Sequence, residues 1–210
     1  MTQTHEIGVI DYGMGNLRSV GKALEHVGGT VYVGSNPKRL ARAAKLVVPG
    51  VGSFGDAIRE LKKRGLINVI RKFASDGKPV LGICLGLQLF FEQSEESPGI
   101  RGLALWKGRV RRIPTSKAPN QKIPHMGWND VRWIKKSPLV SNIRSGSYFY
   151  FVHSYYAVPS DKTSVVGTTR YGTSLPTLLA SGSVYAVQFH PEKSQNPGLQ
   201  ILRNFVRMKR

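Results

Sequence analysis

The sequence contains a single cysteine, Cys84, among its 210 residues. An internal disulfide is therefore excluded, and a reducing compartment is expected. No apolar run approaches the roughly 20 residues that a membrane-spanning helix needs, and the first residues do not follow the pattern of a signal peptide. We expect a cytoplasmic protein that does not bind membranes.

Acidic residues are also scarce. The chain has 12 Asp and Glu against 31 Lys and Arg, which gives a formal net charge of +19. Such a balance can indicate a nucleic-acid-binding protein. However, the basic residues are scattered in short groups, without a long basic run or a recognition motif. We therefore expect a solvated basic surface, or one that complements an acidic partner, and no nucleic-acid partner.

Strands and helices are predicted to alternate in the first half of the chain. Apolar runs predict strands at 7–10, 30–33, 46–48 and 80–83, and apolar residues at helical spacing predict helices between them. This order predicts right-handed β-α-β units and an open, largely parallel sheet flanked by helices, an α/β fold. Ligands of such sheets bind beyond the carboxyl ends of the strands, where Asp11, the loop 49–52 and Cys84 would lie.

The pattern changes after Pro98-Gly99 to short strand-like runs, at 103–106, 108–113, 130–133, 148–152, 164–169, 177–180 and 184–189. This half is expected to be antiparallel, and either to continue the same sheet or to add a second one. A basic, proline-containing loop is predicted at 116–124. Asn196 is predicted to cap the last helix, with Pro197 in its first turn. We expect residues 1–210 to form one domain.

Cys84 lies in the pattern Gly82-x-Cys84-x-Gly86, the spacing of a nucleophile elbow with cysteine in place of serine. A strand that turns sharply into a helix holds its corner residue in a strained conformation, and glycines on either side prevent side chains from colliding. The corner residue also lies at a helix N-terminus, which favours a thiolate. A lone cysteine is more often a small buried apolar residue, but the flanking glycines favour a nucleophile.

A cysteine nucleophile needs a base, and the base needs an orienting group. His190 directly follows the apolar run 184–189, and Glu192 can hold its imidazole in the right tautomer. The alternative is a strand-end histidine bonded to the backbone, with Glu192 at the surface. The other histidines lie near the N-terminus, on a helix face or beside strands: His5, His26, His125 and His153. Together with the elbow, the pattern favours a Cys84-His190-Glu192 triad.

These motifs resemble those of the class I glutamine amidotransferases, over nearly the whole chain. The matching segments are 82–88, 190–192 and the loop 49–54, which matches the oxyanion strand of that family. The resemblance implies a flavodoxin-like sheet and a glutaminase that needs neither metal nor cofactor. Cys84 would attack the side-chain amide of glutamine, His190 would transfer protons, and Glu192 would orient His190.

The resemblance also implies the residues that would hold the substrate. Backbone N–H groups of an oxyanion hole would come from Val51, Gly52 and Leu85. Gln88 lies one helical turn after Cys84 on the same face and can reach the glutamine. The remaining pocket residues would be Glu96, His153, Ser154 and Tyr155. For Glu96, the alternative is a solvated member of an acidic run.

Three segments, 11–17, 124–129 and 190–194, resemble one branch of the family, the glutaminase subunits of imidazole glycerol-phosphate synthase. This implies a heterodimer with a cyclase subunit that uses the ammonia to make imidazole glycerol phosphate and aminoimidazole carboxamide ribotide in histidine biosynthesis. The partner would cover the cavity near Cys84. Its candidate contacts are Asn16, Met126, Trp128 and Tyr150. The loop 49–52 is expected to flip when the partner binds.

Two other functions are compatible with the residues. A glutaminase subunit of another pathway, such as pyridoxal phosphate synthesis, would share the elbow and the triad. A regulator or nucleic-acid-binding protein would use the basic surface and would not need Cys84. The complete set of Cys84, His190 and Glu192 disfavours this second alternative.

Overall fold

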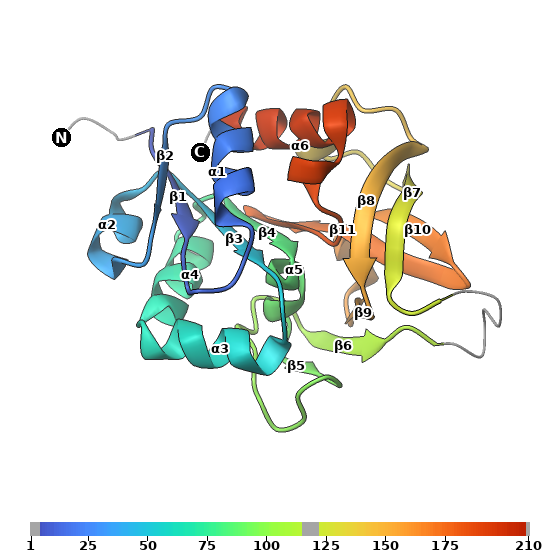
Figure 1. Cartoon of the computed structure of the whole chain (residues 1–210), viewed down its shortest axis with the longest axis horizontal. Helices are drawn as coiled ribbons and strands as arrows, with labels where there is room; N and C mark the ends of the chain where they lie inside the picture. The colour runs from blue at the N-terminus through green and yellow to red at the C-terminus, as the bar shows by residue number, and fades with distance from the viewer. Residues whose placement is uncertain (1–4, 115–121, 209–210) are drawn as a thin grey trace.

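The computed structural model describes residues 5–114 and 122–208, so most of the predicted loop 116–124 lies outside the described residues. A nine-stranded sheet extends through both halves of the chain in the order β2-β1-β3-β4-β12-β11-β10-β7-β8 (Figure 1). Neighbouring strands from β2 to β12 are parallel, and those from β12 to β8 are antiparallel. The strands are β1 (Ile7–Ile10), β2 (Val31–Gly34), β3 (Lys45–Gly50), β4 (Val80–Cys84), β7 (His125–Trp133), β8 (Ser147–His153), β10 (Val165–Tyr171), β11 (Thr173–Ser181) and β12 (Val184–Val187). The predicted α/β class is confirmed.

A second, three-stranded sheet lies beside the first. It is formed by β5 (Gln93–Ser94), β6 (Gly108–Arg112) and β9 (Tyr155–Pro159), in that order. Only Ser154 separates β8 in the large sheet from β9 in the small one. The second half of the chain was expected either to continue the first sheet or to add a second one. In the structure it does both.

Helices cover both faces of the large sheet (Figure 1). Helices α1 (Leu17–His26) and α6 (Gln195–Arg207) lie on one face, and α3 (Phe54–Lys63), α4 (Leu66–Ser75) and α5 (Leu85–Leu89) lie on the other. Helix α2 (Pro37–Arg42) joins the second group through Leu40, which is buried in the same cluster. No described helix is long and apolar enough to cross a membrane.

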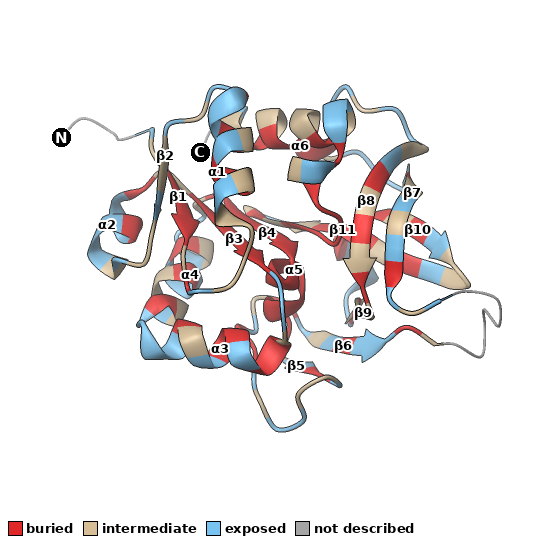
Figure 2. Cartoon of the chain, in the orientation of Figure 1, coloured by how far each residue is buried: buried red, intermediate tan, exposed pale blue. Residues whose placement is uncertain are grey.

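The strands of the parallel half are apolar on both faces, as a sheet covered on both sides requires. Successive side chains point to opposite faces. Val9 packs on the side of α1 and α6, and the adjacent Ile10 packs on the side of α3 and α4; Val47 and Val48 divide in the same way. Figure 2 shows this as buried strands between helices that are exposed on their outer faces.

Three sequence predictions about elements are wrong. The run 103–106 is not a strand, because its N–H groups donate to carbonyls at the end of α5, including Leu103 to Leu89 and Trp106 to Phe90. Strand β3 does not stop at residue 48 but continues to Gly50, which pairs with Cys84. The last helix begins at Gln195, so Ser194 rather than Asn196 is its N-cap residue.

The turn from β4 into α5 is very tight at Cys84. Cys84 has φ 55° and ψ −108°, a strained backbone conformation for a residue other than glycine. A Cβ on Gly82 would lie 2.8 Å from the carbonyl carbon of Gly86, and a Cβ on Gly86 would overlap the carbonyl oxygen of Val48. The glycines are needed for close approach, as the spacing predicts.

We expect Gly86→Ala to destabilise the fold, because its methyl group would displace either α5 or β3. Overpacking of this kind typically costs about 1–3 kcal/mol of unfolding free energy, which urea denaturation followed by tryptophan fluorescence would measure. Gly21→Ala is the matched control. It lies within α1, its Cβ would be 3.3 Å from Val33, and alanine is the better helix former. Equal stability of Gly86→Ala and the unmodified chain would contradict this account of the turn.

Candidate active site

A cavity of about 410 Å³ lies at the carboxyl ends of β3, β4 and β8. It brings together the predicted nucleophile, base, oxyanion residues and glutamine-binding residues, with two that the sequence did not suggest, Pro124 and Val152. The lining residues are Val51, Gly52, Cys84, Leu85, Gln88, Glu96, Pro124, Val152, His153, Ser154, Tyr155 and His190. Its position agrees with the rule that open α/β sheets bind ligands beyond the carboxyl ends of their strands.

Cys84 is nearly buried, with 6% of its surface exposed, and it is the N-cap residue of α5. A backbone carbonyl and a side-chain amide contact its sulfur. The thiol donates to the carbonyl oxygen of Val152 at 3.9 Å, and the side-chain amide of Gln188 donates to the sulfur at 3.9 Å. These contacts hold the sulfur between the end of β8 and the residue that follows β12.

Gln188 is a site residue that the sequence reading missed. It is fully buried, and its Oε1 accepts a hydrogen bond from Gln88 Nε2 at 3.3 Å. The available signal was one polar side chain in the apolar run 184–189, because a buried amide must find partners.

His190 and Glu192 form a buried pair. His190 Nδ1 donates to Glu192 Oε1 at 2.8 Å, and the two side chains are only 3% and 1% exposed. This burial of Glu192 contradicts the alternative of a surface carboxylate. Burial by itself lowers the pKa of His190, but its interactions with Cys84 and Glu192 outweigh burial and raise the pKa to about 10. These interactions therefore favour a protonated imidazole at His190.

The other ring nitrogen, His190 Nε2, is buried without a hydrogen-bond partner in the described part of the chain. A triad histidine holds its orienting carboxylate on one nitrogen and exchanges protons through the other. Since Nδ1 is bound to Glu192 and His190 lines the cavity with Cys84, Nε2 is the nitrogen that can exchange protons with the thiol and with a bound ligand.

The end of β3 is packed against the loop that follows β1. The Tyr12 hydroxyl donates to the Pro49 carbonyl oxygen at 2.8 Å, and a Cβ on Gly50 would overlap this hydroxyl. Burial, and to a smaller degree the charge of Cys84, raise the pKa of Tyr12, so it remains a donor. Val51, by contrast, is 43% exposed. The segment 11–17 therefore supports the predicted oxyanion loop through Tyr12, a role that its sequence did not suggest.

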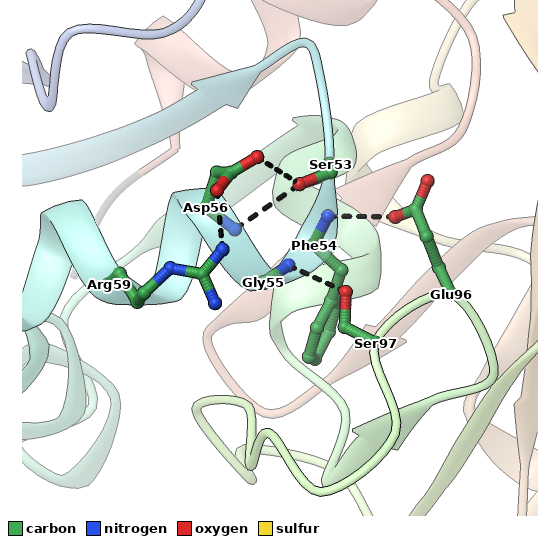
Figure 3. A network of polar contacts seen from close by, with 7 residues as sticks. All are labelled: Ser53, Phe54, Gly55, Asp56, Arg59, Glu96 and Ser97. Carbon is green, nitrogen blue, oxygen red and sulfur yellow. Dashed lines mark hydrogen bonds and ion pairs between the residues drawn. The ribbon is translucent and has the colours of Figure 1, made fainter.

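Glu96 binds the start of α3 (Figure 3). Its Oε2 accepts from the N–H of Phe54 at 2.7 Å, next to the N–H of Gly55, which donates to Ser97 Oγ at 3.0 Å. These bonds satisfy free N–H groups of a helix N-terminus. Glu96 is partly buried and lines the cavity, which contradicts its alternative as a solvated member of the acidic run.

The predicted partner-facing residues lie near the same edge of the sheet. Met126 and Trp128 in β7 are 62% and 47% exposed. The rings of Trp128 and Tyr150 are 6.1 Å apart, and the Tyr150 carbonyl accepts from the backbone N–H of His190 at 2.9 Å. Asn16 is half-buried at the start of α1. The exposed Trp128 is thus linked to His190 through Tyr150.

Two further histidines, His125 and His153, are buried next to the cavity and joined at 2.9 Å from Nδ1 to Nε2. Burial lowers the pKa of His125 to about 4 and that of His153 to about 3. No group of three or more metal-ligating side chains occurs among the residues that the structure describes.

We expect the free energy of unfolding to fall between pH 6.5 and pH 5. Both histidines gain protons near pH 6.5 in the unfolded chain but stay neutral in the folded one, so the unfolded state binds more protons as the pH falls. The loss is at most about 1.4 kcal/mol per pH unit for each histidine. His190 does not oppose it, because a raised pKa gives stability that is complete below pH 6.5 and is lost only as the pH rises toward 10.

Urea denaturation at the two pH values would measure this decrease, and His125→Phe should reduce it. Removal of the exposed His26 by His26→Ala is the control and should leave it unchanged. Equal unfolding free energies at pH 6.5 and pH 5 would contradict the buried neutral pair.

Comparison with known proteins agrees with this geometry. The model of the family "Glutamine amidotransferase class-I" matches residues 8–208. Among solved structures, the chain superimposes on PurLQS from Thermotoga maritima with a TM-score of 0.73 at 20% identity, covering 95% of this chain and 96% of that one. It superimposes on a glutamine amidotransferase with a TM-score of 0.72 at 22% identity, covering 92% and 94%. At these identities, the structures support the fold alone.

Other relatives are more similar to this chain in sequence than these structures are. The chain is 48% identical to imidazole glycerol phosphate synthase subunit HisH of Moorella thermoacetica, over 97% of this chain and 95% of that protein. It is 50% identical to the HisH subunit of Aquifex aeolicus, over 95% of each chain. This chain therefore belongs to the class-I glutamine amidotransferases and, among them, to the HisH family of imidazole glycerol phosphate synthase subunits.

Proposed function

We propose that the chain, as one amidotransferase domain over residues 1–210, is the cytoplasmic glutaminase subunit of an imidazole glycerol phosphate synthase. It hydrolyses glutamine to glutamate and ammonia and passes the ammonia to a cyclase subunit in histidine biosynthesis. The observation that carries the proposal is a single cavity that joins the strained Cys84 to the buried His190–Glu192 pair. The nearly full-length similarity to HisH subunits supports the pathway.

The first half-reaction forms a thioester. The thiolate of Cys84 attacks the carboxamide carbon of glutamine, and the charge that develops on its oxygen is held by backbone N–H groups of Leu85 and of the loop at Val51 and Gly52. Such a donor typically lowers the activation barrier by about 3–4 kcal/mol. Protonated His190 then gives its Nε2 proton to the leaving nitrogen, and ammonia departs.

The second half-reaction releases glutamate. Neutral His190 takes a proton from a water molecule, and the resulting hydroxide attacks the thioester carbon. The carbon–sulfur bond breaks, the thiolate of Cys84 is restored, and His190 is again protonated. Throughout the cycle, Glu192 stabilises the imidazolium through Nδ1 and keeps the ring in one orientation. His190 therefore begins and ends the cycle protonated, the state that its raised pKa favours.

A partner subunit is part of the proposal. Ammonia is mostly protonated in water at neutral pH, and ammonium is not a nucleophile, so the product must reach its acceptor without crossing bulk solvent. The exposed Met126 and Trp128 provide an apolar surface for a cyclase subunit. Met126 is paired in the sheet with Val152, which lines the cavity, and Trp128 is paired with Tyr150. Aromatic residues of this kind are common binding hot spots. The flip of the loop 49–52 on docking is part of the same hypothesis.

We expect glutamate release to depend on the partner and on Cys84. It should be low for the chain alone, rise on adding the cyclase subunit and its ribotide substrate, and disappear in the same mixture with Cys84→Ala. His190→Ala should lose most activity, whereas His26→Ala, which removes an exposed histidine, should retain it. A coupled glutamate dehydrogenase assay measures all of these.

Activity in Cys84→Ala would contradict the nucleophile. A folded chain that binds the cyclase but releases no glutamate in any mixture would contradict the glutaminase. Stimulation by a pyridoxal phosphate synthase subunit instead of the cyclase would keep the glutaminase and change its pathway.

We also expect Trp128→Ala to weaken binding of the cyclase about 10- to 100-fold, because it removes the exposed aromatic side chain of the proposed docking surface. This corresponds to about 1.4–2.7 kcal/mol, and isothermal titration calorimetry would measure it. Ile134→Ala is the matched control, since Ile134 is 59% exposed but follows the opposite end of β7. Equal affinities of both variants would place the partner elsewhere.

A further inference from the structure

The buried histidines His125 and His153 have no part in the mechanism above. His125 begins β7 and His153 ends β8, and the two residues face each other across these strands. Three hydrogen bonds join the two histidines to each other and to their neighbours. Asn129 Nδ2 lies 3.2 Å from His125 Nε2, His125 Nδ1 lies 2.9 Å from His153 Nε2, and His153 Nδ1 lies 2.8 Å from the carbonyl oxygen of Tyr155.

The chemistry of these atoms sets the direction of every bond. A carbonyl oxygen can only accept, so His153 Nδ1 carries the hydrogen. A neutral imidazole has one N–H, so His153 Nε2 accepts and His125 Nδ1 must donate to it. His125 Nε2 then accepts from the amide nitrogen of Asn129. We call the sequence Asn129–His125–His153–Tyr155 carbonyl the histidine chain. Burial, which keeps both rings neutral, is consistent with it.

The histidine chain ends on an oxygen that also holds Gln88. Gln88 Nε2 donates to the Tyr155 carbonyl at 3.1 Å and to Gln188 Oε1 at 3.3 Å, which uses both hydrogens of its amide. In the reverse amide orientation, the Gln88 oxygen would face two acceptors. Gln88 Oε1 makes no hydrogen bond with the described residues, and Gln88 lines the cavity. Gln88 Oε1 is therefore available to accept a hydrogen bond from a ligand in the cavity.

We propose that His125 is a positioning residue that acts through His153 and the Tyr155 carbonyl to orient the amide of Gln88, so that its oxygen accepts an N–H group of the ligand. This inference rests on the proposed function, under which the ligand is glutamine. His125 itself does not line the cavity. The orientation selects a ligand that carries an N–H donor at this point, since a second acceptor would be repelled.

Packing around His125 allows its hydrogen bonds to be removed without removing its ring. Its imidazole stacks between Phe151, with ring centroids 4.6 Å apart, and Tyr171, at 4.0 Å. His125→Phe keeps an aromatic ring in this stack but has no N–H to donate to His153. Tyr171→Phe is the matched control, because it keeps the stacked ring and loses only a hydroxyl that donates to the Lys122 carbonyl.

The tautomers can be tested without any enzyme assay. Two-dimensional ¹⁵N–¹H spectra of the full chain with labelled histidine, at pH 7.5, should show both His125 and His153 as Nδ1–H forms. An exposed neutral histidine in water mostly carries its hydrogen on Nε2. An Nε2–H form at either residue would overturn the proposal, because the direction of the histidine chain would then be different.

Kinetics test the effect on the ligand. With the cyclase subunit and its ribotide substrate present, we expect His125→Phe to raise the KM for glutamine about tenfold and to change kcat by less than about twofold. Tyr171→Phe should match the unmodified chain. Should His125→Phe fail to fold, Asn129→Asp removes the first donor at a half-buried position. It should move the hydrogen of His125 to Nε2 and raise the KM in the same way.

An unchanged KM in folded His125→Phe or Asn129→Asp would overturn the proposal and leave the glutaminase intact. An equal rise in KM with Tyr171→Phe would also overturn it, since the ring stack rather than the hydrogen bonds would then be responsible. Both tautomers as expected, in a chain that releases no glutamate with any partner, would instead contradict the proposed function.

Discussion

The site depends on the close contact between α5 and β3. Because Gly86 touches the Val48 carbonyl, α5 can begin immediately at the end of β4, and Cys84 is held at φ 55° with its sulfur in the cavity. Any larger residue at either flanking glycine would separate the helix from the sheet. The same contact places Gln88 over the cavity, one turn further along α5.

Electrostatics then divides the histidines of the site into two kinds. His190 lies against the carboxylate of Glu192 and near the thiol of Cys84, and its pKa is raised. His125 and His153 are buried against each other and a carbonyl without a carboxylate, and their pKa values are lowered. Burial opposes charge in all three cases, so the interactions of His190 with Cys84 and Glu192 decide which histidine can be an acid. The proposed proton-transfer role of His190 and the proposed hydrogen-bonding role of the neutral pair both rest on this difference.

Sequence motifs predicted the parts of the site that are encoded locally. The elbow depends on residues 82–86, and the His190–Glu192 pair spans three residues, so a short pattern contains all the geometry that each one needs. The resemblance to class I glutamine amidotransferases, and to the imidazole glycerol-phosphate synthase branch, is confirmed by the family match and by the HisH relatives. The α/β class followed from alternating apolar runs for the same reason, because strand and helix periods are properties of neighbouring residues.

The sequence by itself determined the α/β class, the elbow at Cys84 and the candidacy of His190. Only the tertiary structure decided what surrounds them. Tyr12 reaches Pro49 across 37 residues, Gln188 reaches Cys84 across 104, and the histidine chain pairs residues 28 apart. The run 103–106 was misread as a strand because its N–H groups bond to the end of α5 rather than to a neighbouring strand. Contacts of this kind depend on which distant segments pack together, and a local sequence pattern does not specify that packing.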